Sequence, residues 1–313
     1  MRCYQRTGVP IRTITTRRRD FLSQEQYLDK VEKDNLRGPI HRLGDWIVGR
    51  FVDLPRWVRL PLWRYWHAKI ISWDGGYTAV RFMNYGYAPI DEPDLPLEEK
   101  DQHEPFGAHL YHVAVSHVPV EGKELLEVSS GRGGGASYVV RYLHPRRYVG
   151  LDISDRNVEA CERVYRDLPN LEFVQGEAER LPFPDGSFDH VVSVEASRAY
   201  GNVMQFFAEV RRLLRRGGTF LLTDMRWLAD MEMLKGQIAE AGFEIVREVD
   251  IAPNVVKALE RDNQRKVELI QHTVPRMFLS AFSEFAGTIG SDRYRAFADG
   301  RMNYFSWNLR PLG

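Results

Sequence analysis

The 313-residue chain carries 43 basic and 43 acidic side chains, so its formal net charge is zero. Its 43% hydrophobic and 27% charged residues are globular values and exclude a disordered or collagen-like chain. No stretch approaches the roughly 18 consecutive apolar residues of a membrane-spanning helix. Two cysteines, Cys3 and Cys161, are too few for a disulfide framework, and we therefore expect a cytoplasmic protein in a reducing compartment.

The charges are unevenly distributed along the chain. Residues 1–73 hold 15 Lys and Arg against 7 Asp and Glu, whereas residues 91–104 hold seven acids and one lysine. No apolar core of a secretory signal follows the six arginines of residues 1–19, although a transit peptide is an alternative. We expect a basic arm over 1–19, a helical, aromatic-rich extension over 20–90, an acidic connector over 91–104, and an α/β domain over 105–313 with an insertion at about 251–300.

Four large apolar side chains predict a helix within the extension. Trp63, Trp66, Ile70 and Trp73 are spaced by three, four and three residues, which places them on one helix face. The face fits an ordinary core stripe. Because basic residues surround it, it also fits a helix resting on a lipid surface, and a lid over an apolar pocket would have the same pattern.

Strands and helices alternate along the remainder of the chain. We expect strands over residues 124–129, 148–153, 171–176, 188–196, 219–224, 243–250 and 302–309. We expect helices up to about residue 143 and over 155–167, 203–215, 229–241 and 254–287. Alternation at this spacing predicts a parallel sheet with helices on both faces.

A glycine-rich turn follows the first of these strands. The segment EVSSGRGGGA begins at Glu127 and includes Gly131 and Gly133. Glycines allow a sharp turn from strand to helix and let a ligand approach the backbone. Asp152 ends the next strand, 21 residues after Gly131, where a carboxylate can bind ribose hydroxyls. On its own, the turn fits a dinucleotide site, a site for another nucleoside cofactor, or a tight structural turn without a ligand.

Three later blocks narrow the choice. GEAE over 176–179 follows the third strand, LPFPDGSFD over 181–189 precedes the fourth, and LLRRGG over 213–218 precedes the fifth. This order resembles the class I S-adenosylmethionine-dependent methyltransferases, with Glu177 in place of the usual Asp and Arg216 in place of the usual Pro. The resemblance implies a Rossmann-like, seven-stranded α/β methyltransferase sheet with helices on both faces, preceded here by the helical N-terminal extension.

Longer strings narrow the resemblance further. EVSSGRGGGASYVVRYLHP, VEASRAY and FFAEVRRLLRRGG are similar to the phthiotriolone and phenolphthiotriolone dimycocerosate O-methyltransferases and to related polyketide and sugar O-methyltransferases. The similarity covers roughly residues 80–313. It implies S-adenosylmethionine as cofactor and a lipophilic small molecule, such as a polyketide, lipid or other specialised metabolite, as substrate.

The resemblance assigns cofactor roles around the glycine-rich turn. Glu127 would lie near the methionine ammonium, and Gly131 and Gly133 would present the backbone to the amino-acid part. Asp152 would accept both ribose hydroxyls, and Ile153 would pack on the adenine. These positions follow the rule that open α/β sheets bind ligands beyond the carboxyl ends of their strands.

Further cofactor roles fall on later strand ends and on one upstream segment. Gly176, Glu177 and Ala178 form one cofactor-binding block, in which Glu177 would accept from the adenine amino group. Glu195, at the end of the fourth strand, would line the methionine side. Tyr85 lies in FMNYGY, which resembles a segment that closes over the methionine end in small-molecule and lipid methyltransferases; an ordinary aromatic turn is the alternative.

The predicted catalytic group departs from the family pattern. Related O-methyltransferases place a histidine after the fourth strand, where this chain has Arg198, and arginine cannot be a general base. Another group could be the base: Asp224 at the end of the fifth strand, His272 in the insertion, or Tyr200 in an assisting role. Asp224 and His272 each also fit a structural role.

Arginine in place of the histidine is also compatible with a reaction that needs no base. An acidic acceptor needs little base, and Arg198 could pair with its anion. Alternatively, the methyl group goes to carbon, or the chain is a cofactor-retaining cyclase or binding protein without methyl transfer.

The preferred prediction is methylation of a hydroxyl or carboxyl oxygen. No metal is expected, because no Cys or spaced acid completes a site with His109 and His112. No nucleic acid partner is expected, because the domain is not basic. Peripheral membrane contact through the N-terminal helices and a homodimer are left open.

Overall fold

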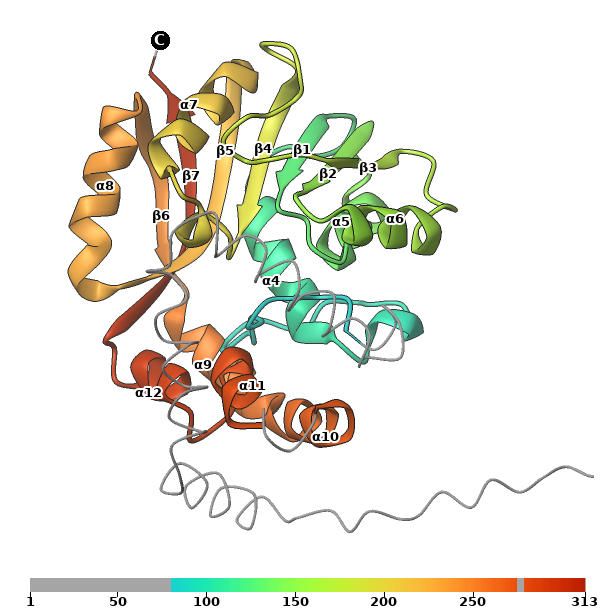
Figure 1. Ribbon diagram of the computed structural model, residues 1–313, viewed down its shortest axis with the longest axis vertical. Helices are drawn as coiled ribbons and strands as arrows, with labels where there is room; N and C mark the ends of the chain where they lie inside the picture. Colours follow the sequence, from blue (N-terminus) through green and yellow to red (C-terminus); the bar gives the residue numbers. More distant parts are fainter. Residues whose placement is uncertain (1–79, 275–278, 313) are drawn as a thin grey trace, which may run out of the picture.

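A single mixed sheet organises the computed structural model, which describes residues 80–274 and 279–312 (Figure 1). Its strands are β1 (Glu124–Val128), β2 (Arg147–Asp152), β3 (Leu171–Gln175), β4 (Phe188–Val194), β5 (Leu214–Trp227), β6 (Phe243–Asp250) and β7 (Met302–Pro311). They are arranged in the order β3-β2-β1-β4-β5-β7-β6. The predicted seven-stranded sheet is confirmed, whereas the basic arm and the extension up to residue 79 lie outside the described residues.

The sheet is not wholly parallel, in contrast to the prediction from strand–helix alternation. Strands β1 to β5 pair in parallel, but β7 runs antiparallel to both β5 and β6. The chain between β6 and β7 stays at one edge of the sheet, because the helices of the insertion lie beyond the lower edge in Figure 1. Since no crossover returns the chain to the opposite edge, β7 enters from the carboxyl edge and runs back.

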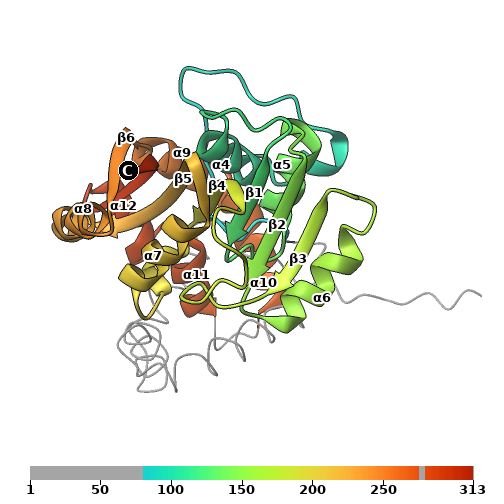
Figure 2. The same cartoon turned by 90° about the horizontal axis from the view of Figure 1, so that it is seen from above.

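Helices cover both faces of the sheet (Figure 2). They are α4 (Pro105–Val115), α5 (Gly134–Leu143), α6 (Asp155–Val164), α7 (Val203–Leu213) and α8 (Met231–Glu240). Helices α4 to α6 pack in one buried cluster with Leu125 of β1, and α7 and α8 pack in a second cluster with the adjacent Leu126. Alternate residues of a strand point to opposite faces, which is why neighbouring leucines enter different cores.

One predicted boundary was wrong between α7 and β5. The helix ends at Leu213 and the strand begins at Leu214, five residues before the predicted start. Leu214 is already extended and pairs with Phe188 of β4. The Gly217–Gly218 pair therefore lies inside the strand, not at the end of the helix.

The insertion is a group of short helices and not the single long helix expected over 254–287. These helices, which we call the lid, are α9 (Ala252–Arg261), α10 (Asn263–Thr273), α11 (Leu279–Ala286) and α12 (Asp292–Ala298). Gly287 and Gly290 adopt positive φ angles of 65° and 92° after α11, which ends the helix. The Ser291 side chain then accepts from the Tyr294 amide and caps α12.

Residues 80–90, which we call the strap, contain no helix, so the predicted helical extension does not reach residue 90. The backbone amides of the strap bond to distant segments. Tyr87 donates to the carbonyl of Phe106 at 2.9 Å, and Ala88 donates to that of Asn254 at 3.1 Å. An amide that bonds outside its own segment cannot contribute to a helix, and the strap consequently ties α4 to the lid.

The acidic segment 91–104 packs against the domain through two buried acids. The carboxylate of Asp101 is fully buried and accepts from Arg81, Arg141 and Tyr142. Burial alone would raise the pKa of Asp101, but these hydrogen bonds hold it at about 2. Glu104 is also buried and accepts from the Arg81 amide at 3.0 Å.

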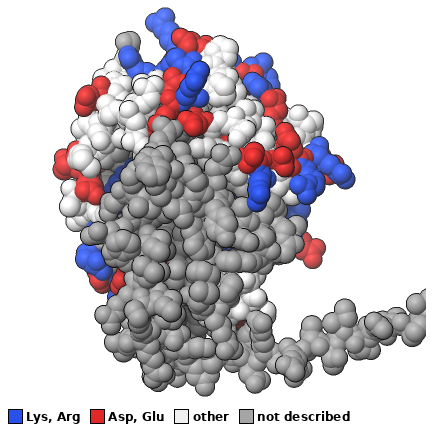
Figure 3. Space-filling model, in the orientation of Figure 1, with Lys and Arg blue, Asp and Glu red and all other residues white. Residues whose placement is uncertain are grey.

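Surface charges of both signs are interspersed over the described part of the face in Figure 3. Pairs such as Arg147 with Glu172 and Lys235 with Glu248, each at 2.9 Å, are partly exposed. Such pairs contribute up to about 1 kcal/mol each, so they add less than the buried pairs at Asp101. Within residues 80–274 and 279–312, no helix is long and apolar enough to cross a membrane.

Substitution of Asp101 by Asn is expected to destabilise the protein by about 3 to 5 kcal/mol, because it leaves two arginines partly buried without their carboxylate. Urea unfolding would measure the loss. Glu92→Gln, an exposed change in the same segment, should alter stability by less than about 0.5 kcal/mol. Equal effects of the two substitutions would show that the segment is not anchored through Asp101.

Candidate active site

The predicted cofactor residues gather at the carboxyl ends of β1, β2 and β4. These three strands pair in parallel and are neighbours in the sheet, so their ends meet at one edge. The strap crosses this edge, since Tyr85 in the strap bonds to Glu195 after β4. The structure therefore brings together residues that are 110 positions apart in the chain.

The glycine-rich loop is fastened to the end of β2. Gly131 and Gly133 adopt positive φ angles of 56° and 73°, which favour glycine. The Gly131 amide donates to Asp152 Oδ2 at 2.9 Å, and the Ser154 amide donates to Oδ1 at 2.9 Å. Burial raises the pKa of Asp152, and these backbone hydrogen bonds oppose the rise. Asn157 Nδ2 also donates to Oδ1 at 3.2 Å. A carboxylate has about four acceptor sites, so Asp152 retains some acceptor capacity beyond these three donors.

The space over Gly131 suits a ligand. Among the residues that the structure describes, a side chain built at Gly131 would meet only the sulfur of Met83 in the strap, at 3.7 Å. At Gly133, by contrast, Tyr165 and Phe173 lie within 2.8 Å of such an atom. Gly133 therefore serves packing beneath the loop, whereas Gly131 leaves room above it.

Glu127 lies deeper than its predicted role near an ammonium group requires. Its carboxylate is fully buried, and it accepts from the Tyr111 hydroxyl at 2.6 Å and from the Tyr148 hydroxyl at 3.0 Å. Burial raises the pKa of Glu127 to about 7, partly offset by these hydrogen bonds. Both oxygens thus face tyrosines beneath the loop.

Glu195 is the centre of the site. Its Oε1 accepts from the Tyr85 amide at 2.7 Å and from the Tyr304 hydroxyl of β7 at 2.5 Å. Burial raises the pKa of Glu195 to about 7, against the lowering effect of these two donors and of Arg198. Its φ angle is 55°, a conformation that is uncommon for a residue other than glycine and that recurs at active sites. We call the arrangement of Tyr85, Glu195 and Tyr304 the clasp.

Lys266 of α10 belongs to the site, although no sequence pattern selects it. Its Nζ lies 5.9 Å from the centre of the Tyr85 ring and 3.4 Å from the Tyr85 carbonyl oxygen. Burial lowers the pKa of Lys266 to about 8. No motif surrounds this residue, and only its place on the inner side of the lid identifies it.

The residues predicted to hold the adenine lie at the ends of β2 and β3. Ile153 is half-buried, and Gly176 donates its amide to the Asp152 carbonyl at 3.0 Å. Glu177 is exposed, and Ala178 packs against the second core cluster. The four residues therefore flank Asp152, on the side of the edge away from Glu195.

Tyr200 is joined to the glycine-rich loop. Its hydroxyl lies 2.9 Å from Ser129 Oγ, and its ring packs edge-on against Phe206 at 4.7 Å. Burial raises the pKa of Tyr200 above its ordinary value, so the hydroxyl stays protonated at neutral pH. Ser129 has a φ angle of 68°, another left-handed residue at this edge.

Asp224 braces the segment that carries Arg198. It is fully buried on β5, and its Oδ2 accepts from the Ser197 amide at 2.9 Å and from the Ser197 hydroxyl at 2.6 Å. Arg226 completes the group with an ion pair to Asp224 at 3.2 Å. These contacts fix the short helix η3 (Ser197–Ala199) against the sheet.

The last two catalytic candidates are both exposed. Arg198 lies on η3, three residues after Glu195. His272 lies near the end of α10, where its Nδ1 is 2.7 Å from the Glu268 carbonyl oxygen of the same helix. The structure therefore places Arg198 beside the clasp and occupies one nitrogen of His272 with its own helix.

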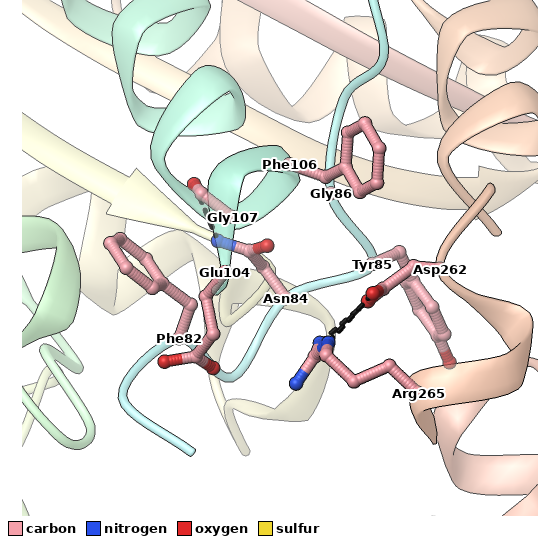
Figure 4. Close-up of a pocket in the computed structure, with 9 residues that line it drawn as sticks. All are labelled: Phe82, Asn84, Tyr85, Gly86, Glu104, Phe106, Gly107, Asp262 and Arg265. Atoms are coloured by element: carbon pink, nitrogen blue, oxygen red, sulfur yellow. Dashed lines mark hydrogen bonds and ion pairs between the residues drawn. The ribbon is translucent and has the colours of Figure 1, made fainter. Parts of the chain in front are cut away.

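A polar pocket opens between the strap, α4 and α10 (Figure 4). Asn84 donates to the Gly107 carbonyl at 3.3 Å, while its Oδ1 has no partner among the described residues. Across the pocket, Arg265 pairs with Asp262 at 2.6 Å. Its empty space is only about 210 Å³ even when the part open to solvent is included, so we do not assign the cofactor to it.

The pKa of Glu127 predicts how stability depends on pH. When folding raises the pKa of an acid, the contribution of that acid to stability is fully present below its pKa in the unfolded state. The contribution is lost as the pH rises through its pKa in the folded state. The free energy of unfolding should therefore fall between pH 4.5 and about 7, by roughly 3 kcal/mol at most for this group. Urea titrations across this range should show a smaller decrease for Glu127→Gln. An unchanged pH slope in that variant would contradict the assignment.

Comparison with known proteins gives the same picture as the geometry. The family described as "Methyltransferase domain" matches residues 126–222. The phthiotriol/phenolphthiotriol dimycocerosates methyltransferase of Mycobacterium tuberculosis is 38% identical over 245 residues, which are 78% of this chain and 89% of that protein. A fatty-acid O-methyltransferase of Mycolicibacterium smegmatis is 37% identical over 230 residues, or 74% and 82% of the two chains.

Solved structures agree on the fold. A geranyl diphosphate methyltransferase in complex with S-adenosylmethionine superposes with a TM-score of 0.56 at 17% identity, over 74% of this chain and 100% of that one. The predicted family resemblance is confirmed by relatives of this identity and coverage. This chain belongs to the class I S-adenosylmethionine-dependent methyltransferases, and it is an enzyme with S-adenosylmethionine as its cofactor.

Proposed function

We propose that this enzyme transfers a methyl group from S-adenosylmethionine to a hydroxyl or carboxyl oxygen of a lipophilic small molecule. The two curated relatives are named for acceptors of this kind, dimycocerosates and fatty acids. The observation that carries the proposal is the clasp, because it holds Glu195 and the strap at the same sheet edge as Asp152 and the glycine-rich loop.

The cofactor roles follow from this arrangement. Asp152 binds the ribose hydroxyls, and Gly131 presents its open face to the amino-acid part. Glu195 replaces Glu127 as the carboxylate nearest the methionine ammonium, because both oxygens of Glu127 accept from tyrosines. When bound, the cofactor supplies an electrophilic methyl group on sulfur. The protein's own task is then to align the acceptor and exclude water.

The catalytic roles in this proposal differ among the four candidates. Asp224 positions η3 and is not the base, because Ser197 and Arg226 occupy it. His272 lies on the exposed side of α10 and is outside the reaction. Tyr200 supports the loop through Ser129, and Arg198 faces the acceptor.

Cofactor binding gives the first test. Asp152→Asn keeps the side-chain shape but loses the charge that binds the ribose, so the Kd for S-adenosylmethionine should rise about tenfold or more. Asp155→Asn, at an exposed position three residues later, is the matched control and should leave the Kd unchanged. Isothermal titration would measure both values, and equal Kd values for the two variants would contradict the role of Asp152.

The reaction itself is tested by product analysis. Incubation with a methyl-labelled cofactor and lipophilic acids and alcohols should give S-adenosylhomocysteine only when an acceptor is present. Mass spectrometry should locate the label on oxygen. Label on carbon would support a C-methyltransferase, and conversion of a substrate without S-adenosylhomocysteine would support a cyclase.

The two candidate bases should behave differently on substitution. His272→Ala should keep kcat within about twofold, as expected for an exposed residue away from the chemistry. Asp224→Asn should lower thermal stability, because it removes the ion pair with half-buried Arg226 and weakens the bonds to Ser197. A large loss of kcat in His272→Ala with normal folding would return His272 to the role of base.

Membrane contact is a separate part of this proposal. The basic and aromatic residues of 20–73, which include Trp63 and Trp66, would bring the enzyme to the surface where lipophilic acceptors gather. Flotation with anionic liposomes should be weakened by Trp63→Ser combined with Trp66→Ser. Unchanged flotation would argue against this contact. Light scattering on the same protein preparations, before liposomes are added, would establish whether the enzyme is a homodimer.

A further inference from the structure

Two arginines beside the clasp have no acidic partner in the part of the chain that the structure describes. Neither Arg198 nor Arg293 forms a salt bridge within residues 80–274 and 279–312. By contrast, Arg226 pairs with Asp224, and Arg265 pairs with Asp262. Arginine is suited to bidentate recognition of a carboxylate, so two such guanidinium groups at one site favour an anionic ligand.

Arg198 reaches the site from the sheet. It lies on η3 immediately after Ser197, whose amide and hydroxyl both bond to Asp224. The backbone next to Arg198 is thereby fixed, while its side chain is exposed. Its positive charge lowers the pKa of Glu195, as expected for a guanidinium that follows this residue by one turn of chain.

Arg293 reaches the same site from the lid. It lies on α12 one turn before Phe297, whose ring packs edge-on against Tyr85 at 5.6 Å. Its Nη1 donates to the sulfur of Met302 at 3.2 Å, and a thioether is a weak acceptor. Met302 stands two residues before Tyr304 on β7, hence on the same face of the sheet as the clasp hydroxyl.

The acids near these arginines are already engaged. Glu195 accepts from Tyr85 and Tyr304, and Glu284 accepts from the amides of Asp292 and Arg293. Burial raises the pKa of Tyr85; the charges of Arg293 and Arg198 oppose the rise, and those of Glu195 and Glu284 add to it. Lys266 adds a third cation over the Tyr85 ring.

The geometry points to Arg198 and Arg293 as a two-armed binding site for the carboxylate of the acceptor, so that the acceptor is a lipophilic carboxylic acid and the product is its methyl ester. This inference rests on the proposed function, since it selects one of the two acceptor classes that the function leaves open. One arm comes from the sheet and the other from the lid, which also couples lid position to acceptor binding.

Methyl transfer to a carboxylate needs no general base. A carboxylate oxygen attacks the methyl carbon, a carbon–oxygen bond forms, and the carbon–sulfur bond breaks with its electron pair returning to sulfur. The acid is already ionised at neutral pH, so no proton has to be removed. This accounts for Arg198 at the position where related enzymes have histidine, and for the structural engagement of Asp224.

The test compares an acid with its alcohol. Binding of tetradecanoate and tetradecan-1-ol to the complex with S-adenosylhomocysteine is measured by calorimetry, which requires no turnover. Arg198→Gln and Arg293→Gln should each raise the Kd for the acid about tenfold or more and leave that for the alcohol within twofold. Arg198→Lys, which keeps the charge, should recover part of the affinity. Arg295→Gln is the control, because Arg295 lies on the same helix but pairs with Asp292.

The outcomes separate this inference from the proposed function. Any of three results would overturn the inference. The affinity for the acid could be unchanged in Arg198→Gln and Arg293→Gln, or it could fall equally in Arg295→Gln. The wild type could also bind the acid no more tightly than the alcohol. If methyl ester forms but binding ignores the arginines, the function stands and this inference falls. If the acid binds through the arginines but no ester forms, the binding site stands and the proposed reaction is wrong.

Discussion

The site depends on the hydrogen bonds that converge on Glu195. One carboxylate oxygen accepts from the amide of Tyr85 in the strap and from the hydroxyl of Tyr304 in the last strand. Three segments that are remote in sequence therefore share one acceptor at the edge of the sheet. Hydrogen bonds to a carboxylate contribute more than those between neutral groups, and these two help to hold Glu195 in its left-handed conformation.

The antiparallel last strand makes this convergence possible. Because β7 begins at the carboxyl edge, its first residues lie at the same edge as the end of β4, with β5 between the two strands, and the Tyr304 hydroxyl reaches Glu195 there. The lid that precedes β7 stays at the same edge and contributes Lys266 and Arg293 from its inner side. Glu195 thus comes from the sheet, Arg198 from the short helix η3 that follows it, and Lys266 and Arg293 from the lid. This distribution suits a site that must hold a cationic cofactor and an oxygen acceptor together.

Local sequence patterns predicted the elements well and the long-range contacts poorly. The strand over 243–250 and the glycine-rich turn were predicted correctly, because alternation and glycine spacing are local properties. The long helix expected over 254–287 is several short helices, because α9 already ends at Arg261 and Val274, the residue before Pro275, is extended at the end of α10. Periodicity alone did not contain that information.

The same distinction applies to the site. Asp152 was predicted beside the glycine loop, and it bonds to that loop as a strand-end acid should. The partners of Glu127 could not be predicted, because Tyr111 and Tyr148 lie on other elements and meet it only through packing. Lys266 and Tyr304 were not predicted as site residues for the same reason. Burial and tertiary neighbours define their chemistry, and no motif marks them.

We expect the cofactor to bind at the edge of the sheet that the clasp closes. Hydrogen–deuterium exchange with and without S-adenosylhomocysteine tests it directly. We expect slower exchange in peptides that cover the strap and the glycine-rich loop, residues 80–90 and 129–135, when the ligand is present. Unchanged exchange in both segments at a saturating ligand concentration would contradict it.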